Sequence, residues 1–240
     1  MTPATLAATA ISERIIEWLH CVEGDPNTWT ALNAWDHESL KSLARARVPA
    51  LTGRQTTLWR CLSDAENERI HVSEKVKSFW RDKKAAIDEQ LEVLLEAEES
   101  EDELDEEGKK KREAFLAKAI EAWQVSLADI LRKVNRELVG PYALGECQLA
   151  TLDVISLGAT GDQLSLADLH LAAWMARLVT LAGGTTADDG RTAVGRVEAR
   201  VGGGFSVPKM HGRKESKLAG FWDAMKERPS WKKIYRAGLF

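Results

Sequence analysis

The sequence predicts an all-α protein, and three observations lead to that expectation. Apolar residues recur every three or four positions over several long stretches, which is the spacing of one helix face. Ser, Thr or Asp stands three residues before an acid or amide at several points, a pattern that caps helix starts. No stretch alternates apolar and polar residues for long enough to predict a strand.

Composition limits the classes of function. A chain of 240 residues with 44% apolar content can bury a sizeable core in one or two domains, and its net charge of −4 does not favour nucleic acid or an anionic membrane. Cys21, Cys61 and Cys147 are too far apart for a disulfide framework or a metal site. No signal-type segment or long uncharged apolar run is present. We therefore expect a cytoplasmic protein that binds no metal, membrane or nucleic acid.

The first hundred residues predict helices joined by polar stretches. Apolar spacing predicts a helix within residues 5–22, followed by the linker "EGDPNTW". A short helix, "DHESLKSLARAR", is expected to end at Pro49, because the residue before a proline avoids helical geometry. Thr52 with Gln55 would then cap one very long helix that reaches about Glu98.

The stretch "EAEESEDELDEE", residues 96–107, holds nine acids in twelve residues, and "KKKR" follows it. Acids favour a helix start and pair with basic residues four positions later, so we expect a solvated turn and then a helix over about 105–139. A binding tail for basic partners is the alternative interpretation. The two long helices would run antiparallel, with the acidic turn at their tip.

Two near-identical segments differ in what precedes them. "SLADIL", residues 126–131, continues an existing apolar helical pattern, so Ser126 is expected in mid-helix. "SLADLH", residues 165–170, follows a glycine-containing stretch, so Ser165 and Asp168 are expected to form a capping box. The helix that they open should run from Leu166 to Ala182 and lie buried, with a narrow polar stripe of His170, Arg177 and Thr180.

The last sixty residues predict a surface loop and a closing helix. The Gly-rich stretch from 183 to 216 lacks the residues of a phosphate-binding loop and is expected to be a flexible connection. Pro229 should end the closing helix, and Ser230 should cap a last turn. The basic residues of this region predict a solvated face rather than a nucleic-acid stripe. One apolar face of the closing helix should be buried, made up of Leu218, Phe221, Trp222 and Met225.

Three motifs in order resemble a known family. "GPYALGE" at 140–146, "LSLADLHLAAW" at 164–174 and "FWDAMKERPSWKKIY" at 221–235 resemble the C-terminal helical domain of cytosolic glutathione transferases, above all fungal ones. The resemblance covers roughly residues 36–240 and implies a bundle of that type. It implies that Ser165 and Asp168 open the buried helix and that the Arg-Pro-Ser segment beginning at Arg228 closes the domain.

The resemblance also implies what is missing. A complete transferase begins with a thioredoxin-like domain, whereas residues 1–35 offer one helix and a linker, which we interpret as a remnant of that domain. "SERIIEWL", residues 12–19, resembles its last helix, in which Ser12 would contact glutathione. An amphipathic helix packed on the bundle is the alternative. No thiol-activating residue is found, and the family's acceptor site implies that Trp59 lines an apolar groove.

Two functions from different classes follow. The first is a glutathione transferase-like protein whose helical domain 36–240 binds an apolar small molecule and which is not catalytic as this chain alone, with glutathione as a cofactor implied by resemblance only. The second is a non-catalytic interaction module of the kind found in translation factor and synthetase complexes. A homodimer or another protein partner fits both hypotheses.

Overall fold

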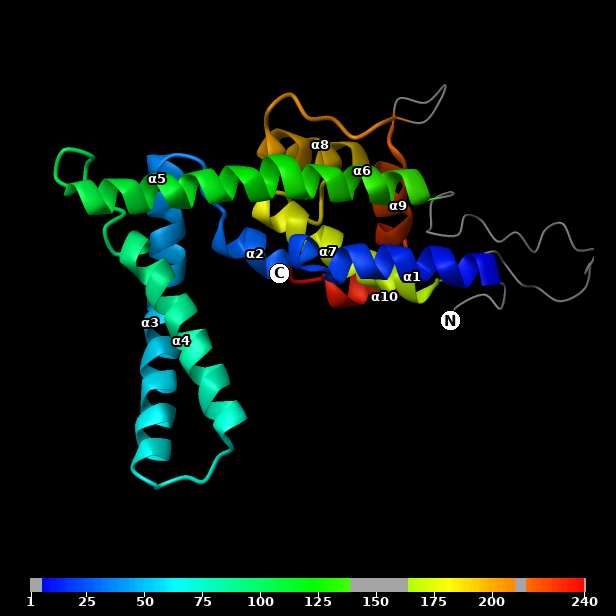
Figure 1. Cartoon of the computed structure of the whole chain (residues 1–240). Coiled ribbons are helices and arrows are strands. Elements are labelled where there is room, and N and C mark those ends of the chain that lie inside the picture. The colour runs from blue at the N-terminus through cyan, green and yellow to red at the C-terminus, as the bar shows by residue number, and fades with distance from the viewer. Residues whose placement is uncertain (1–5, 139–163, 210–214, 240) are drawn as a thin grey trace, which may run out of the picture. The chain divides into compact units, whose positions relative to one another are not determined.

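The computed structural model describes residues 6–138, 164–209 and 215–239 of the chain (Figure 1). Over these residues the chain forms helices and connecting turns and no strand, apart from one isolated bridge between Lys209 and Ser216. The expectation of an all-α protein is confirmed. The motif "GPYALGE" lies outside the described residues.

The chain divides into two compact units. We name the described residues of Met1–Ala31 and Glu121–Phe240 the core unit, and Leu32–Ile120 the hairpin unit. The sequence predicted a division at residue 35 with everything after it in one domain. The structure divides the chain differently, because the first two helices pack with the C-terminal half.

Among its described residues the core unit contains seven α-helices, one 3₁₀ turn and one π-helical segment. The 3₁₀ turn η1 and the π-helical η2 connect or extend α-helices. The bounds are α1 Leu6–His20, η1 Val22–Gly24, α2 Pro26–Ala31, η2 Glu121–Leu127, α6 Ala128–Glu137, α7 Leu166–Leu181, α8 Gly190–Val201, α9 Lys217–Lys226 and α10 Pro229–Ile234.

Helix α7 supplies the centre of the core unit. It packs against α1, α2, α8 and α9, and most of its side chains are buried. Three indole rings meet beside it: Trp29 lies 5.6 Å from Trp174 in an edge-to-face arrangement and 6.5 Å from Trp123 between ring centroids. Such pairs stabilise a core beyond the area that they bury. The N-terminal segment is therefore an integral part of this core.

A helix occupies part of the stretch that was expected to be a loop. Helix α8 spans Gly190–Val201, and Asp189 caps it by accepting a hydrogen bond from the Thr192 N–H at 2.7 Å. The prediction was wrong because glycines at both ends obscured the apolar spacing of Val194, Val197 and Val201. Gly190 lets α8 approach α9 closely, since a Cβ there would lie 2.0 Å from the Ala219 carbonyl oxygen.

The C-terminal helices differ slightly from the expectation. The expected apolar face of α9 is buried, including Phe221 and Trp222. Pro229 does not end α9 but occupies the first position of the following helix, α10. Arg228, rather than Ser230, is the N-cap residue of α10. Proline suits a first helical position because its missing N–H has no partner there in any case.

The hairpin unit consists of three helices. These are α3 His37–Glu66, α4 Glu74–Leu94 and α5 Glu106–Ile120. Helices α3 and α4 pack against each other, and the Gln55 amide donates a hydrogen bond to Asp88 across the pair at 2.6 Å. Asp36 caps α3 in a box with Ser39.

Two of the predicted boundaries in this unit are wrong. Helix α3 continues through Pro49 to Glu66, so Thr52 lies in mid-helix and is not a cap. Pro49 is exposed, so its ring faces solvent, while Leu43 and Leu51 on either side are buried. Burial of that apolar face outweighs the hydrogen bond that a proline removes.

The expected long helix to Glu98 is broken instead at residues 67–73. Asn67 ends α3, Glu68 takes the left-handed conformation with φ 56°, and Ser73 caps α4. A left-handed residue just past a helix end is a common way to satisfy the last carbonyls. The pairing expected between a 52–98 helix and a 105–139 helix is therefore replaced, within the hairpin unit, by the pairing of α3 with α4.

The helical stretch after the acidic turn agrees with the sequence. Helices α5 and α6, joined by η2, leave no non-helical residue between Glu106 and Glu137. Ser126 lies inside η2, in mid-helix as expected. A π-helical insertion was not predicted, because it leaves the apolar spacing almost unchanged.

Candidate ligand-binding site

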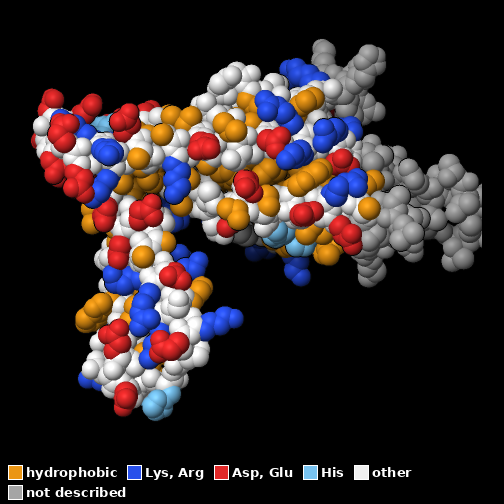
Figure 2. Space-filling model, viewed as in Figure 1, with side chains coloured by type: hydrophobic (Ala, Val, Ile, Leu, Met, Phe, Trp, Pro, Cys, Tyr) orange, Lys and Arg blue, Asp and Glu red, His pale blue; other side chains and the backbone are white. Residues whose placement is uncertain are grey.

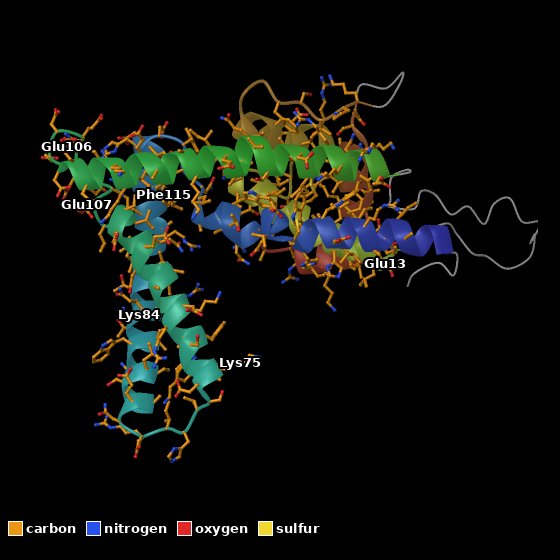
Figure 3. All side chains as sticks on the ribbon, viewed as in Figure 1. Glu13, Lys75, Lys84, Glu106, Glu107 and Phe115 are labelled. Carbon is orange, nitrogen blue, oxygen red and sulfur yellow. The ribbon has the colours of Figure 1, made fainter. Side chains whose placement is uncertain are left out.

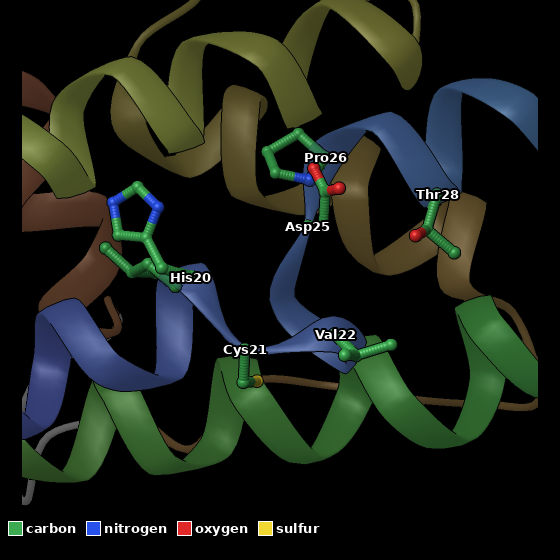
Figure 4. A pocket seen from close by; sticks show the side chains of 7 residues that line it. His20, Cys21, Val22, Asp25, Pro26 and Thr28 are labelled. Carbon is green, nitrogen blue, oxygen red and sulfur yellow. The ribbon is translucent and has the colours of Figure 1, made fainter. Parts of the chain in front are cut away.

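An open hollow of about 360 Å³ lies in the core unit where α1 ends and α2 begins (Figure 4). His20 stands on one side of it, and Asp25, Pro26 and Thr28 lie across from that ring. The volume falls within the range of small-molecule sites in proteins. Its lining mixes apolar and polar side chains and consists of Leu19, His20, Cys21, Val22, Asp25, Pro26 and Thr28.

The hollow exists because the chain turns tightly against α1. Gly24 ends the 3₁₀ turn, and a Cβ there would lie 1.9 Å from the Trp18 carbonyl oxygen. The Trp174 indole N–H donates to the Gly24 carbonyl at 2.9 Å, which fixes the turn to α7. Any side chain at position 24 would therefore push the turn off α1 and open the site.

Two histidines from distant parts of the sequence meet beside the hollow. His20 Nε2 lies 2.7 Å from His170 Nδ1, and the rings are edge to face with centroids 4.8 Å apart. One ring donates and the other accepts, so the pair needs at least one neutral imidazole. Burial, followed by the charge of His20, lowers the pKa of His170 below its usual 6.5.

A second polar contact joins the same two segments. The Arg177 guanidinium donates to the Thr30 hydroxyl from Nε at 3.3 Å and from Nη2 at 3.2 Å. The polar stripe predicted on α7 therefore contacts the N-terminal segment: His170 bonds to α1 and Arg177 to α2. The sequence identified the stripe but not its partners, because nothing local connects residues 150 positions apart.

The groups at the hollow favour binding over nucleophilic chemistry. The Cys21 thiol donates to the Trp18 carbonyl oxygen at 3.2 Å. Asp25 accepts bonds from the Asn27 backbone and side chain, both at 2.9 Å. What the hollow offers a ligand is one exposed apolar side chain, Val22, 82% exposed, beside an imidazole and a carboxylate. That combination suits an apolar molecule with a polar end.

Neither Ser12 nor Trp59, the two residues assigned to ligands by resemblance, lines this hollow. Ser12 is 3% exposed on α1, and its hydroxyl has no hydrogen-bond partner within the described residues. The contact of Ser12 with glutathione that the resemblance implies stays a prediction. Trp59 lies on α3 of the hairpin unit and is 61% exposed, so its indole faces solvent.

The capping box at the start of α7 is present in the structure. The Asp168 carboxylate accepts bonds from the Ser165 N–H at 2.8 Å and the Ser165 hydroxyl at 2.6 Å. The Ser165 hydroxyl in turn accepts from the Asp168 N–H at 3.2 Å. Both side chains are buried, at 1% and 0% exposure, so the box organises the helix and faces no ligand.

Across residues 6–138, 164–209 and 215–239, no three His, Cys, Asp or Glu side chains are grouped so that they could hold a metal ion. None of the helices described there combines the length and apolar character needed to cross a bilayer.

Comparison with known proteins adds no relative. No family model, no curated protein and no solved structure matches the chain.

Proposed function

We propose that the chain is a glutathione transferase-like binding protein, not catalytic by itself, whose core unit holds an apolar small molecule with a polar end. The observation that carries this proposal is the hollow beside Val22, which combines apolar walls with His20 and Asp25. The proposal keeps the function that the sequence motifs imply. It moves the ligand from Trp59 to the junction of α1 and α2.

The contacts around the hollow support a preformed site. The Trp174 indole holds the turn by its hydrogen bond to the Gly24 carbonyl, and the His170 ring contacts the His20 ring. A site whose walls are fixed before binding loses less conformational entropy when a ligand enters. The bundle type and the transferase kinship remain part of the proposal, on the strength of the motifs at 164–174 and 221–235.

The experiment is a titration of the folded chain with the apolar dye ANS. Val22→Asp places a charge in the hollow at an exposed position, so the fold should be kept. Val125→Asp is the matched control, because Val125 is 62% exposed in the same unit and does not line the hollow. We expect one-site binding that weakens at least about tenfold in Val22→Asp alone, the effect of roughly 1.4 kcal/mol.

Equal dye binding by both variants would refute the site. Two parallel arms test the rest of the proposal. A titration with glutathione in place of the dye tests whether the implied cofactor binds to the chain. An assay of glutathione conjugation to a chlorinated aromatic is expected to stay at the uncatalysed background, and clear turnover would overturn the non-catalytic part.

The second candidate function, an interaction module, is favoured by a different observation. The hairpin unit exposes large apolar side chains on both helices of its pair, with Trp59 61% and Phe79 55% exposed. Exposed aromatic residues are enriched at protein interfaces.

A further inference from the structure

The lining of the hollow at the junction of α1 and α2 carries one acid and no strong base. Asp25 is the only Asp or Glu among the described residues that line it, and none of them is Lys or Arg. The Asp25 side chain is half-buried and lies across the hollow from the His20 ring (Figure 4). A charge that is partly shielded from water acts more strongly on a ligand than a fully exposed one. The hollow therefore discriminates between ligands by the sign of their charge.

Asp25 and Thr28 keep hydrogen-bond acceptors available to a ligand. The Asn27 backbone N–H and side-chain amide both donate to Oδ1 of Asp25, at 2.9 Å, and Oδ2 accepts no hydrogen bond from a described residue. The Thr28 hydroxyl lies on the same side of the hollow and makes no hydrogen bond within the described part of the chain. A carboxylate oxygen and a hydroxyl oxygen both accept, so this wall presents two acceptors.

The lining offers few donors in return. The Cys21 thiol already donates to the Trp18 carbonyl oxygen at 3.2 Å, and one ring nitrogen of His20 already contacts His170. An ammonium group carries three N–H donors and no acceptor, whereas a carboxylate ligand carries only acceptors. The available groups of the hollow therefore match an ammonium group better than an anion.

The surroundings of the hollow have the same sign of charge. Residues 15–31 hold no Lys or Arg and three acids, Glu17, Glu23 and Asp25. The π-helical η2, which packs against η1, adds Glu121 and no Lys or Arg. Arg177 reaches α2 from α7, but its guanidinium is bound to the Thr30 hydroxyl. Figure 2 shows histidine side chains at the surface of the core unit with acidic side chains on the same face. Such a field attracts cations and repels anions.

We propose that the hollow takes a small organic amine, with its ammonium group on Asp25 and Thr28 and its apolar body against Val22. The inference rests on the proposed function, because it names the polar end of the ligand that the hollow holds. Asp25 accepts one N–H of the ammonium group, and Thr28 accepts a second. The volume of about 360 Å³ is near the lower end of the roughly 300–1,000 Å³ range of small-molecule sites, which limits the size of the amine.

The first test compares three probes that each have eight carbon atoms and differ in the head group: octylammonium, octanol and octanoate. Calorimetric titration of the intact chain at pH 8 keeps an alkylamine charged while an ordinary imidazole is neutral. We expect octylammonium to bind at least about tenfold more tightly than octanol, since hydrogen bonds between charged groups are the strong ones. Octanoate should bind more weakly than octanol. Octylammonium should also displace ANS, which places both in the same hollow.

Asp25→Asn then removes the charge with little change of shape. Asparagine still accepts the bonds from Asn27 through its own Oδ1, so the turn should be kept, and circular dichroism checks the fold. The affinity for octylammonium should fall at least about tenfold, and the affinity for octanol should change by less than about twofold. The affinity for ANS should rise, because its sulfonate is no longer repelled. These opposite signs separate a lost charge from a damaged hollow.

Glu13→Gln is the matched control, because it removes the same charge from the same segment. Glu13 is exposed on α1, does not line the hollow, and lies nearer the N-terminal end of the helix (Figure 3). About seven helical residues separate it from His20, which is roughly 10 Å at 1.5 Å per residue and exceeds the screening length of about 8 Å. All affinities should therefore stay within about twofold of the wild type.

The failure of this inference is distinguishable from the failure of the proposed function. If octanol and ANS bind but octylammonium binds no more tightly than octanol, the amine is refuted and the binding site stands. If none of the probes binds, the hollow is not a ligand site and both proposals fail. An Asp25→Asn variant that loses no more affinity for octylammonium than Glu13→Gln does would also overturn the inference.

Discussion

The capping box at the start of α7 should contribute several times more to the free energy of unfolding than the near-identical segment in η2 and α6. In Ser165→Ala the chain loses the hydroxyl that donates to Asp168 at 2.6 Å and accepts from the Asp168 N–H at 3.2 Å. The released N–H group is buried, so water cannot replace the lost partner without the helix start opening.

The expected cost follows from those two losses. A lost N-cap typically costs about 0.5–2 kcal/mol, and a buried donor left without a partner about 1–3 kcal/mol, so Ser165→Ala should cost about 2–3 kcal/mol. Asp168→Ala should cost at least as much, about 3 kcal/mol, because it removes a charged acceptor from two buried donors. Asp168→Asn keeps one acceptor and should fall between Asp168→Ala and the wild type.

The matched controls come from the second copy of the motif. Ser126→Ala should change stability by no more than about 0.5 kcal/mol, since alanine is the better helix former there. Asp129→Ala loses an exposed pair with Lys133, 2.6 Å between charged atoms, worth about 0.2–0.5 kcal/mol.

Urea unfolding followed by tryptophan fluorescence measures all five variants at comparable slope. Midpoints for Ser165→Ala and Asp168→Ala should fall by about 1 M. If Ser126→Ala proves as damaging as Ser165→Ala, the assignment of the cap to α7 alone is refuted.

Three further predictions follow from single contacts. Gly190→Ala should destabilise the core unit by about 2 kcal/mol or more in urea, because its Cβ would lie 2.0 Å from the Ala219 carbonyl, and an unchanged midpoint would contradict the close approach. The pKa of His170 is lower in the folded chain than in the unfolded chain, so the unfolded chain takes up a proton first as the pH falls. The stability that neutral His170 contributes is therefore present above pH 6.5 and is lost as the pH falls through the folded pKa. Midpoints at pH 7.5 and 5.5 should therefore differ less in His170→Asn than in the wild type, and equal differences would remove His170 as a cause. Trp59→Ala should change the free energy of unfolding by no more than about 0.5 kcal/mol and should leave the affinity for ANS unchanged. A loss of dye binding would restore Trp59 to the ligand site.

Local signals predicted the parts of the fold that local forces decide. The cap at Ser165 and the apolar face around Phe221 were predictable because each depends on residues three or four positions apart. The break at residues 67–73 was missed because apolar residues continue in register on both sides of it. Only the polar residues Asn67 and Ser73 signalled it.

The candidate site was largely invisible to sequence reasoning. His170 was predicted to lie on the polar stripe of its helix, but its contact with His20 depends on α1 packing against α7, which no local pattern encodes. Gly24 lay in the stretch assigned to a linker, and Val22 lay at the end of the helix predicted within residues 5–22. A Gly-Asp-Pro sequence directly after an amphipathic helix was the available signal, since such residues mark a tight turn.

The most direct test of the binding site is a map of amide chemical shifts in the labelled chain as ANS is added. We expect the largest changes to be confined to Leu19–Thr28 and to His170, which contacts that segment. Changes centred on Trp59 in α3, or none within Leu19–Thr28, would contradict it.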